Sequence, residues 1–267
     1  MIVANLGAAA IAVLGLGEAG SLMARDLTRA GATVRGYDPD LHGDLSGIPL
    51  AASPAEAVRG AAVVLSVNWA RVALDVARDA LPHLRPGAIF ADCNTAGPAL
   101  KAELASLFAG GSAAFVDVAM MAPVPPLGIR VPMFLAGAGA ERLAPILRRF
   151  GTPVDVVGPT AGDAAARKLT RSVFFKGMSA AIWEALEAAR AAGVEEWLRA
   201  DIARTLSEAN AATLERIVEG TRRHARRRAH EMTDAAALLD QLGVPSTIAR
   251  ATAASLERVV AEQGASV

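Results

Sequence analysis

The chain of 267 residues has a single cysteine, Cys93, and therefore cannot form an internal disulfide. Scarce cysteine is typical of proteins from a reducing compartment, so we expect a cytoplasmic protein. A lone cysteine is most often a small buried residue, and we interpret Cys93 in that way.

The sequence also lacks an excess of charge. Lys plus Arg and Asp plus Glu each number 27, so the formal net charge is zero and no nucleic acid is expected as a partner. One basic run, residues 222–230, could bind nucleic acid or an anionic substrate, but it contains no aromatic residue to stack on bases. We interpret it as a solvated or interface face of a helix, with substrate contact as the alternative.

No apolar run is long enough to cross a membrane without a charge or a glycine, so no membrane partner is expected. The first 17 residues are apolar, but they lack the basic start of a signal peptide and run into a glycine turn. Internal repeats and low-complexity linkers are missing as well. Hydrophobic residues make up 53% of the chain, so a sizeable core can form.

The most informative pattern that is present covers residues 10–38. An apolar strand runs into Gly15-x-Gly17-x-x-Gly20, a helical segment follows, and a second strand ends at Asp38. This order is typical of dinucleotide binding, because the glycines allow a tight turn, leave room for a pyrophosphate and let the helix pack closely. The helix start also presents N–H groups to the anion. The predicted cofactor contacts in this loop are Gly15, Leu16, Gly17, Glu18, Ala19 and Gly20.

Asp38 lies 18 residues after Gly20, where a carboxylate can accept hydrogen bonds from a ribose diol. An acid at this position also repels a 2′-phosphate, so the expected cofactor is NAD, with NADP as the alternative. Asp38-Pro39-Asp40 is a good turn sequence too, and a plain turn is the other interpretation. No metal is expected.

Short apolar runs alternate with helical segments in the N-terminal half. This alternation predicts an α/β fold, a Rossmann-type doubly wound parallel sheet covered on both faces. The predicted strands are 10–15, 33–37, 62–67, 88–92, 114–118, 133–136 and 153–157. The predicted helices are 17–30, 53–59, 71–81, 98–108 and 141–150.

After Gly162 the sequence shows no convincing strand, which predicts an all-helical C-terminal domain. Helices are expected at 163–192, 195–207, 208–228, 233–242 and 246–262, with Gly193 and Gly243 as stops. We predict a dinucleotide-binding domain over residues 1–160 and a substrate and dimerisation domain over residues 161–267. The helices of the C-terminal domain carry several apolar faces that must be buried against something, so we expect a homodimer formed through this domain.

Polar residues follow two of the predicted strands. Because ligands bind beyond the carboxyl ends of such strands, Ser66, Val67 and Asn68 are expected near the cofactor. Asn94 and Thr95 end the next strand and could hold the nicotinamide amide or a polar group of the substrate. Capping of the helix that starts at Pro98 is an equally good interpretation, which Thr95 suits well.

The helix after Gly162 carries cations within an otherwise apolar sequence. Lys168, Arg171 and Ser172 share a face, and Lys176 lies one turn beyond Ser172. A desolvated lysine beside a carbonyl can act as a general acid or base, and arginine suits a carboxylate or phosphate. We expect Lys168 to be catalytic and the others to bind an acidic small-molecule substrate. A solvated helix edge is the alternative.

These motifs resemble, in order, those of the β-hydroxyacid dehydrogenase superfamily, which includes 3-hydroxyisobutyrate and 6-phosphogluconate dehydrogenases. The resemblance covers the loop from Gly15 to Leu27, the segment from Asp92 to Pro98, and Phe115-Val-Asp117. It continues through Gly162 with Lys168, and through His230-Glu-Met232. It implies hydride transfer on a small hydroxy acid or semialdehyde, with Lys168 as the general acid or base and His230 near the substrate.

The chain also departs from that superfamily. Met121-Ala122-Pro123 replaces its usual Ser-Gly-Gly, which makes Met121 a candidate substrate contact, and Arg171 and Ser172 replace its asparagines. These features resemble a branch with a divergent, poorly characterised helical C-terminal domain. Two alternatives therefore accompany the NAD(P)-dependent dehydrogenase: an imine reductase acting on C=N bonds, and a non-catalytic NAD(H)-binding sensor.

Overall fold

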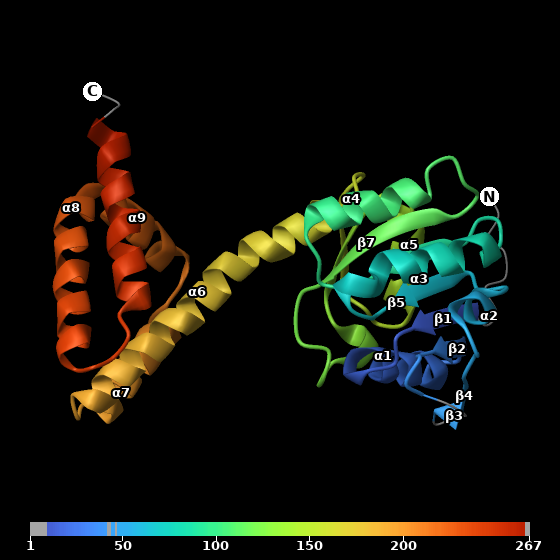
Figure 1. Ribbon diagram of the computed structural model, residues 1–267, viewed down its shortest axis with the longest axis horizontal. Coiled ribbons are helices and arrows are strands. Elements are labelled where there is room, and N and C mark those ends of the chain that lie inside the picture. Colours follow the sequence, from blue (N-terminus) through green and yellow to red (C-terminus); the bar gives the residue numbers. More distant parts are fainter. Residues whose placement is uncertain (1–9, 42–43, 46, 265–267) are drawn as a thin grey trace. The chain divides into compact units, whose positions relative to one another are not determined.

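A computed structural model of the chain describes residues 10–41, 44–45 and 47–264. It divides into two compact units, Met1–Arg171 and Ser172–Val267, each described here by itself (Figure 1). None of the helices it describes is both long and apolar enough to cross a bilayer.

The first unit is built on a seven-stranded sheet in the order β2-β1-β5-β6-β7-β8-β9. The strands β1, β2, β5, β6 and β7 run parallel, as the sequence predicts. Their bounds are β1 (Ala10–Leu14), β2 (Thr33–Tyr37), β5 (Val63–Ser66), β6 (Ile89–Asp92), β7 (Ala114–Met120), β8 (Met133–Ala136) and β9 (Val154–Gly158).

The predicted parallel sheet has an exception at β8, which pairs with β7 in the antiparallel sense. A parallel neighbour needs a crossover connection, usually a helix. Between β7 and β8 the chain has only the short turn η3 (Gly128–Arg130), so the strand returns directly beside its predecessor. The two-residue strands β3 (Asp44–Leu45) and β4 (Ile48–Pro49), which form a separate hairpin, are too short to leave a pattern in the sequence.

Helices cover both faces of the sheet, as expected for a doubly wound fold (Figure 1). On one face α1 (Glu18–Arg29) and α5 (Ala140–Arg149) bury apolar side chains such as Leu27 and Leu143 against the strands. On the other face α2 (Pro54–Val58), α3 (Ala73–Ala80) and α4 (Pro98–Leu107) do the same. Short 3-10 turns, η1 (Ala70–Val72) and η2 (Leu81–His83), flank α3.

Every regular element of the second unit, among the residues that the structure describes, is a helix. Helix α6 (Asp163–Ala191) runs into it from the first unit, and α7 (Glu195–Glu208), α8 (Ala211–Gln241) and α9 (Thr247–Gly264) follow. Gly193 and Gly243 adopt positive φ angles just after helices, which confirms both predicted stops. The predicted break between residues 228 and 233 is wrong. Helix α8 continues through it, because no glycine or proline lies between residues 225 and 241, and instead kinks at His224.

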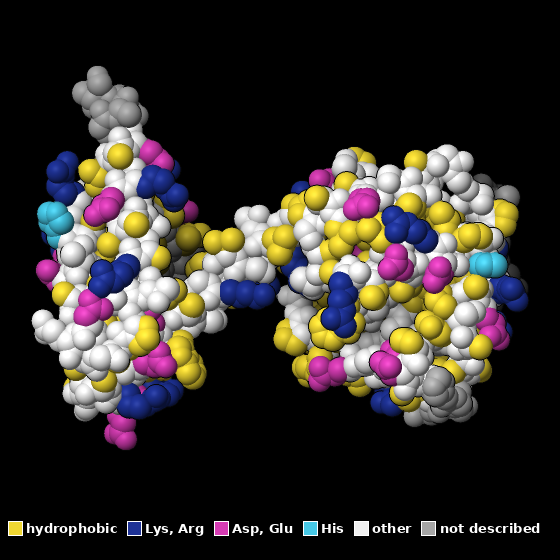
Figure 2. Space-filling model, in the orientation of Figure 1, with side chains coloured by type: hydrophobic (Ala, Val, Ile, Leu, Met, Phe, Trp, Pro, Cys, Tyr) yellow, Lys and Arg dark blue, Asp and Glu magenta, His cyan; other side chains and the backbone are white. Residues whose placement is uncertain are grey.

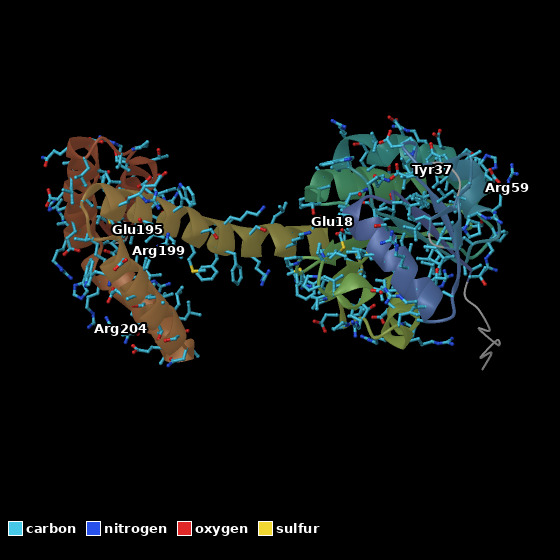
Figure 3. All side chains as sticks on the ribbon, turned by 90° about the horizontal axis from the view of Figure 1, so that it is seen from below. Glu18, Tyr37, Arg59, Glu195, Arg199 and Arg204 are labelled. Carbon is cyan, nitrogen blue, oxygen red and sulfur yellow. The ribbon has the colours of Figure 1, made fainter. Side chains whose placement is uncertain are left out.

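Polar contacts fix the helix ends of the second unit. Glu184 of α6 is buried and accepts hydrogen bonds from the N–H groups of Ile248 and Ala249, at 2.7 and 2.8 Å, which caps the start of α9. Glu195 on α7 accepts hydrogen bonds from Arg190 and Arg199, which lower the pKa of its carboxyl to about 2 (Figure 3).

Candidate active site

The glycine-rich loop joins β1 to α1 in the geometry that a dinucleotide needs. Gly15 has a φ of +95°, and a Cβ there would lie 2.2 Å from the Val67 carbonyl oxygen. A Cβ on Gly20 would lie 1.9 Å from the Gly15 carbonyl oxygen, so only glycine lets α1 start this close to the loop. A Cβ on Gly17 would meet nothing within 4 Å. The side of the loop at Gly17 is therefore open to a ligand.

Helix α1 begins at this open position. The first helical bond of the turn runs from the Ser21 N–H to the Gly17 carbonyl oxygen. The N–H groups of Glu18, Ala19 and Gly20 precede it and have no carbonyl of the same helix to bind. Such groups, together with the helix dipole, suit a pyrophosphate. The loop thus fits the phosphate part of a dinucleotide.

Asp38 directly follows β2 and lies beside the loop, and both interpretations of it find support. Its Oδ2 accepts a 2.7 Å hydrogen bond from the Leu16 N–H, which ties the acid to the glycine loop. Its Oδ1 accepts a 3.0 Å hydrogen bond from the Asp40 N–H, as in a turn. Each carboxylate oxygen can accept a further bond, so these contacts leave the acid able to bind a ribose hydroxyl.

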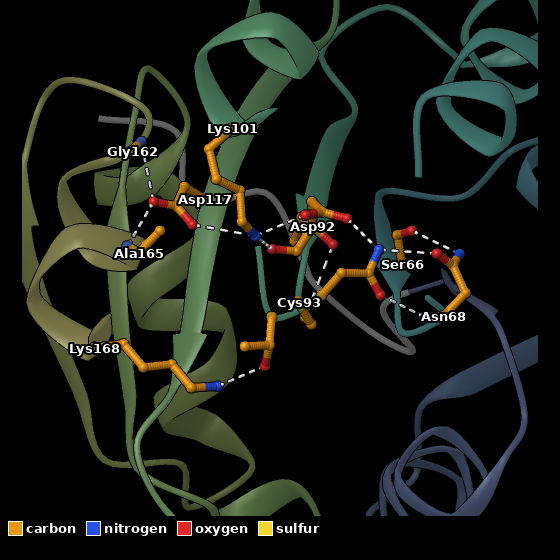
Figure 4. A network of polar contacts seen from close by, with 12 residues as sticks. Ser66, Asn68, Asp92, Cys93, Lys101, Asp117, Gly162, Ala165 and Lys168 are labelled. Atoms are coloured by element: carbon orange, nitrogen blue, oxygen red, sulfur yellow. Dashed lines mark hydrogen bonds and ion pairs between the residues drawn. The ribbon is translucent and has the colours of Figure 1, made fainter. Parts of the chain in front are cut away.

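A chain of amide side chains follows the carboxyl ends of β5 and β6 (Figure 4). Asn94 donates to Asp92 Oδ1 and Asn68 Oδ1, at 2.6 and 2.9 Å, and accepts from the Asn68 N–H. Asn68 in turn donates to the buried Ser66 hydroxyl. Both N–H groups of the Asn94 amide are engaged, so this side chain chiefly holds the loop that carries Thr95.

Lys101 lies at the centre of this network, and sequence reasoning missed it. Its Nζ is 2.6 Å from Asp92 Oδ2 and 3.2 Å from Asp117 Oδ1, and the three side chains are at most 1% exposed. Lysine side chains on helices are usually exposed to solvent, so nothing local to Lys101 in the sequence indicates that it is buried. The available signal was the pair of acids, because Asp92 and Asp117 both lie within apolar strands.

Asp117 carries the network on to the start of α6. Its Oδ2 accepts hydrogen bonds from the N–H groups of Gly162 and Ala165, each 3.0 Å long. A carboxylate at this place satisfies the otherwise unpaired N–H groups of the helix start and complements its dipole. Lys101 and Asp117 thereby fix where α6 begins, at Asp163, five residues before Lys168 (Figure 4).

The structure brings Lys168 and Thr95 together from distant parts of the sequence. Lys168 Nζ donates a 2.9 Å hydrogen bond to the Thr95 hydroxyl. The helix cap before Pro98 is Gly97, so the alternative role of Thr95 as that cap is not what the fold uses. Arg171 donates to the Met121 carbonyl oxygen at 3.2 Å, which places two further candidates side by side. The remaining candidates, Ser172, Lys176 and His230, belong to the second unit.

Burial shapes the acid–base properties of the network. It raises the pKa of Asp92 above its usual 3.8, while the attraction of Lys101 opposes the shift. Burial also raises the pKa of the Cys93 thiol to about 12, with the charge of Asp92 adding to it. Cys93 is 2% exposed and therefore a packing residue, as the sequence analysis interpreted it. Among the residues described, no group of three His, Cys, Asp or Glu side chains is placed to bind a metal.

Comparison with known proteins agrees with this geometry. Residues 10–158 match the family described as the NAD binding domain of 6-phosphogluconate dehydrogenase. Residues 189–259 match a domain of unknown function, DUF1932.

Several solved structures resemble nearly the whole chain. A conserved hypothetical protein from Sinorhizobium meliloti is 32% identical, with a TM-score of 0.61, over 93% of this chain and 87% of that one. A conserved protein described as structurally similar to 3-hydroxyacid dehydrogenases is 28% identical, with a TM-score of 0.62, over 94% of this chain and 97% of that one.

The fold alone is shared with a more distant enzyme. An imine reductase variant from Myxococcus stipitatus, in complex with NAD⁺, has a TM-score of 0.78 at 20% identity, over 95% of this chain and 94% of that one. With more than half of its length matched, the chain belongs to the family of the 6-phosphogluconate dehydrogenase NAD binding domain, within the β-hydroxyacid dehydrogenase superfamily.

Proposed function

We propose that this protein is an NAD-dependent oxidoreductase that interconverts a carbonyl and a hydroxyl group on a small acidic substrate. The observation that carries the proposal is the hydrogen bond between Lys168 and Thr95 at the carboxyl edge of the sheet. In a doubly wound fold this edge is where ligands bind, and the glycine loop opens onto the same edge. A half-buried lysine there is a group that can exchange a proton with a substrate.

A nicotinamide dinucleotide held by the loop from Gly15 to Gly20 would supply the hydride that reduces the carbonyl carbon. Lys168 donates a proton to the carbonyl oxygen, which becomes the hydroxyl, and is left as a neutral amine that water reprotonates. Thr95 holds the Lys168 ammonium in place, and Asn94 holds the Thr95 loop through its bonds to Asn68 and Asp92. In the oxidative direction the neutral lysine takes the hydroxyl proton.

The remaining candidates serve binding in this proposal. Gly15 to Gly20 hold the pyrophosphate, and Asp38 accepts from the ribose diol. Asp40 follows two residues later. A 2′-phosphate would need a cation near this position, and the two carboxylates would repel it, so we favour NAD over NADP. Arg171 would bind the acidic group of the substrate through its planar fork. Ser172, Lys176 and His230 are proposed as further substrate contacts, and the cytoplasm as the compartment.

A substrate panel tests the function. The purified protein is incubated with NADH or NADPH and a set of small keto acids, semialdehydes and hydroxy acids, while absorbance at the nicotinamide band is followed. We expect turnover with at least one hydroxy acid or semialdehyde and a preference for NADH. Tight NADH binding without any turnover would contradict the proposal and support a sensor.

Reduction of C=N bonds is the second candidate function. Its support is the fold shared over 95% of the chain with the imine reductase from Myxococcus stipitatus. The retained Lys168 favours carbonyl chemistry. Cyclic imines are therefore included in the panel, and faster reduction of these than of every carbonyl would favour the second function.

We also propose a homodimer formed through the second unit. This unit exposes large apolar side chains, with Val173 77%, Trp183 67% and Trp197 66% exposed. Exposed apolar groups of this size on neighbouring helices indicate a surface that is covered in solution. Sedimentation at micromolar concentration should give twice the mass of the chain, and a monomer mass would contradict the dimer.

A further inference from the structure

A basic hollow lies on helix α8 in the second unit and shares only His230 with the candidate substrate contacts. It has a volume of about 420 Å³ and is lined by Arg223, His224, Arg226, Arg227 and His230. We propose that this hollow binds a small phosphate-bearing molecule with at least two negative charges.

The helical spacing explains why these side chains meet. Residues 223, 226, 227 and 230 follow the three- and four-residue intervals that place side chains on one face of a helix. The buried residues Ala225 and Ala229 lie on a different face, and α8 packs against α9. At His224 the backbone leaves helical geometry, with φ −122° and ψ 20°, and its ring joins the same hollow.

The charge of the hollow is largely uncompensated. Residues 222–231 contain five arginines and one acid, Glu231, in a chain whose formal net charge is zero. Glu231 pairs with Arg227 at 2.5 Å. Among the residues described, no carboxylate lies within ion-pair distance of the Arg223 or Arg226 guanidinium. Like charges held this close repel one another, and a multivalent anion relieves the repulsion.

The side chains present match phosphate chemistry. Arginine offers several N–H donors in a planar fork that fits phosphate oxygens, and three arginines converge here with two imidazoles. On the surface of the second unit, Figure 2 shows basic side chains and a histidine with acidic side chains between them. A hollow of this volume falls within the range of small-ligand sites.

A nucleic acid is a poorer match for this surface. From residue 223 to residue 230 the helix rises only about 10 Å. The same helix carries the acids Glu215, Glu219 and Asp234 beyond the basic run, which would repel a longer polyanion. The run also has no aromatic side chain on which bases could stack. The occupant we favour is therefore a compact anion.

Titration calorimetry with pyrophosphate tests the site in the full-length protein at 150 mM NaCl, with and without saturating NAD. NAD should displace pyrophosphate from the glycine loop and leave binding on α8 unchanged. The double variant Arg223→Gln/Arg226→Gln should weaken the NAD-insensitive binding by about a hundredfold, or about tenfold per arginine. Glu231→Gln should strengthen it, because the competing carboxylate is gone.

The matched control is Arg204→Gln/Arg216→Gln, which removes the same charge from exposed arginines on α7 and α8 outside the hollow. We expect less than a twofold change in this control. Equal weakening in both double variants would overturn the proposal, as would the absence of NAD-insensitive binding at millimolar pyrophosphate. Tighter binding of a duplex oligonucleotide at the same arginines would overturn the assignment to a small ligand. Each of these readouts is independent of turnover.

Discussion

Replacing Lys101 with methionine would leave the buried carboxylates of Asp92 and Asp117 without their cation. The lysine Nζ lies 2.6 and 3.2 Å from them, and neither acid is exposed. Removing one partner of a buried ion pair typically costs about 3–5 kcal/mol, because the remaining charge is not solvated. We expect a loss of this size in the unfolding free energy of the first unit, or a fall of about 10 °C in its melting temperature.

The loss should depend on pH. Burial already raises the pKa of Asp92 above 3.8, and Lys101 acts against this shift. An acid whose folded pKa is raised contributes stability that is fully present below its unfolded pKa and is lost as the pH rises through its folded pKa. Without Lys101 the folded pKa rises further. The difference between the wild-type protein and Lys101→Met should therefore be small near pH 4 and grow towards neutral pH.

Cys93 provides an assay that reports on the first unit alone. It is the only cysteine of the chain, it is 2% exposed, and it directly follows Asp92, the last residue of β6. A thiol reagent added in pulses across a urea series should label Cys93 only where this unit has opened. Lys176→Met, at an exposed lysine on α6, is the control and should change stability by less than about 0.5 kcal/mol. A Lys101→Met loss below about 1 kcal/mol, or one independent of pH, would refute the reasoning.

Three further substitutions test the cofactor site and the second unit. Asp38→Asn should weaken NADH binding about tenfold and NADPH binding less, by fluorescence titration; equal losses would contradict the ribose contact. Gly20→Ala places a Cβ 1.9 Å from the Gly15 carbonyl oxygen and should abolish measurable NADH binding. A Cβ on Gly177 of α6 would meet nothing within 4 Å, so Gly177→Ala should instead raise the melting temperature of the protein. Glu184→Gln should destabilise the second unit by about 1–2 kcal/mol in calorimetry, whereas the exposed Glu208→Gln should leave it unchanged.

Much of the fold was predictable because its signals are local. Each parallel strand is a short apolar run between helical segments, and Gly193 and Gly243 end their helices as glycine after a helix should. The antiparallel direction of β8 has no local signal in the sequence, because it depends on the path of the connection between β7 and β8. The kink of α8 at His224 also lacks a glycine or proline to mark it.

The candidate site was predictable in part for the same reason. The glycine loop, Asp38 and Lys168 lie in recognisable sequence motifs, so their places in the candidate site could be predicted. The Lys101 network could not be, because its three charges come from β6, α4 and β7 and meet only in the folded sheet. For Thr95 the sequence supported helix capping and ligand binding equally well. Its contact with Lys168 joins residues 73 positions apart, which no local pattern could indicate.

The central claim is that Lys168 exchanges the substrate proton in an NAD-dependent reaction. The most direct measurement is the turnover number of Lys168→Met on a substrate found in the panel, at saturating NADH, with Arg216→Met, at an exposed cation outside the candidate site, as the control. We predict that Lys168→Met lowers the turnover number by about 10²–10⁴-fold while the dissociation constant for NADH stays unchanged. Unchanged turnover, in a variant that binds NADH normally, would contradict the account.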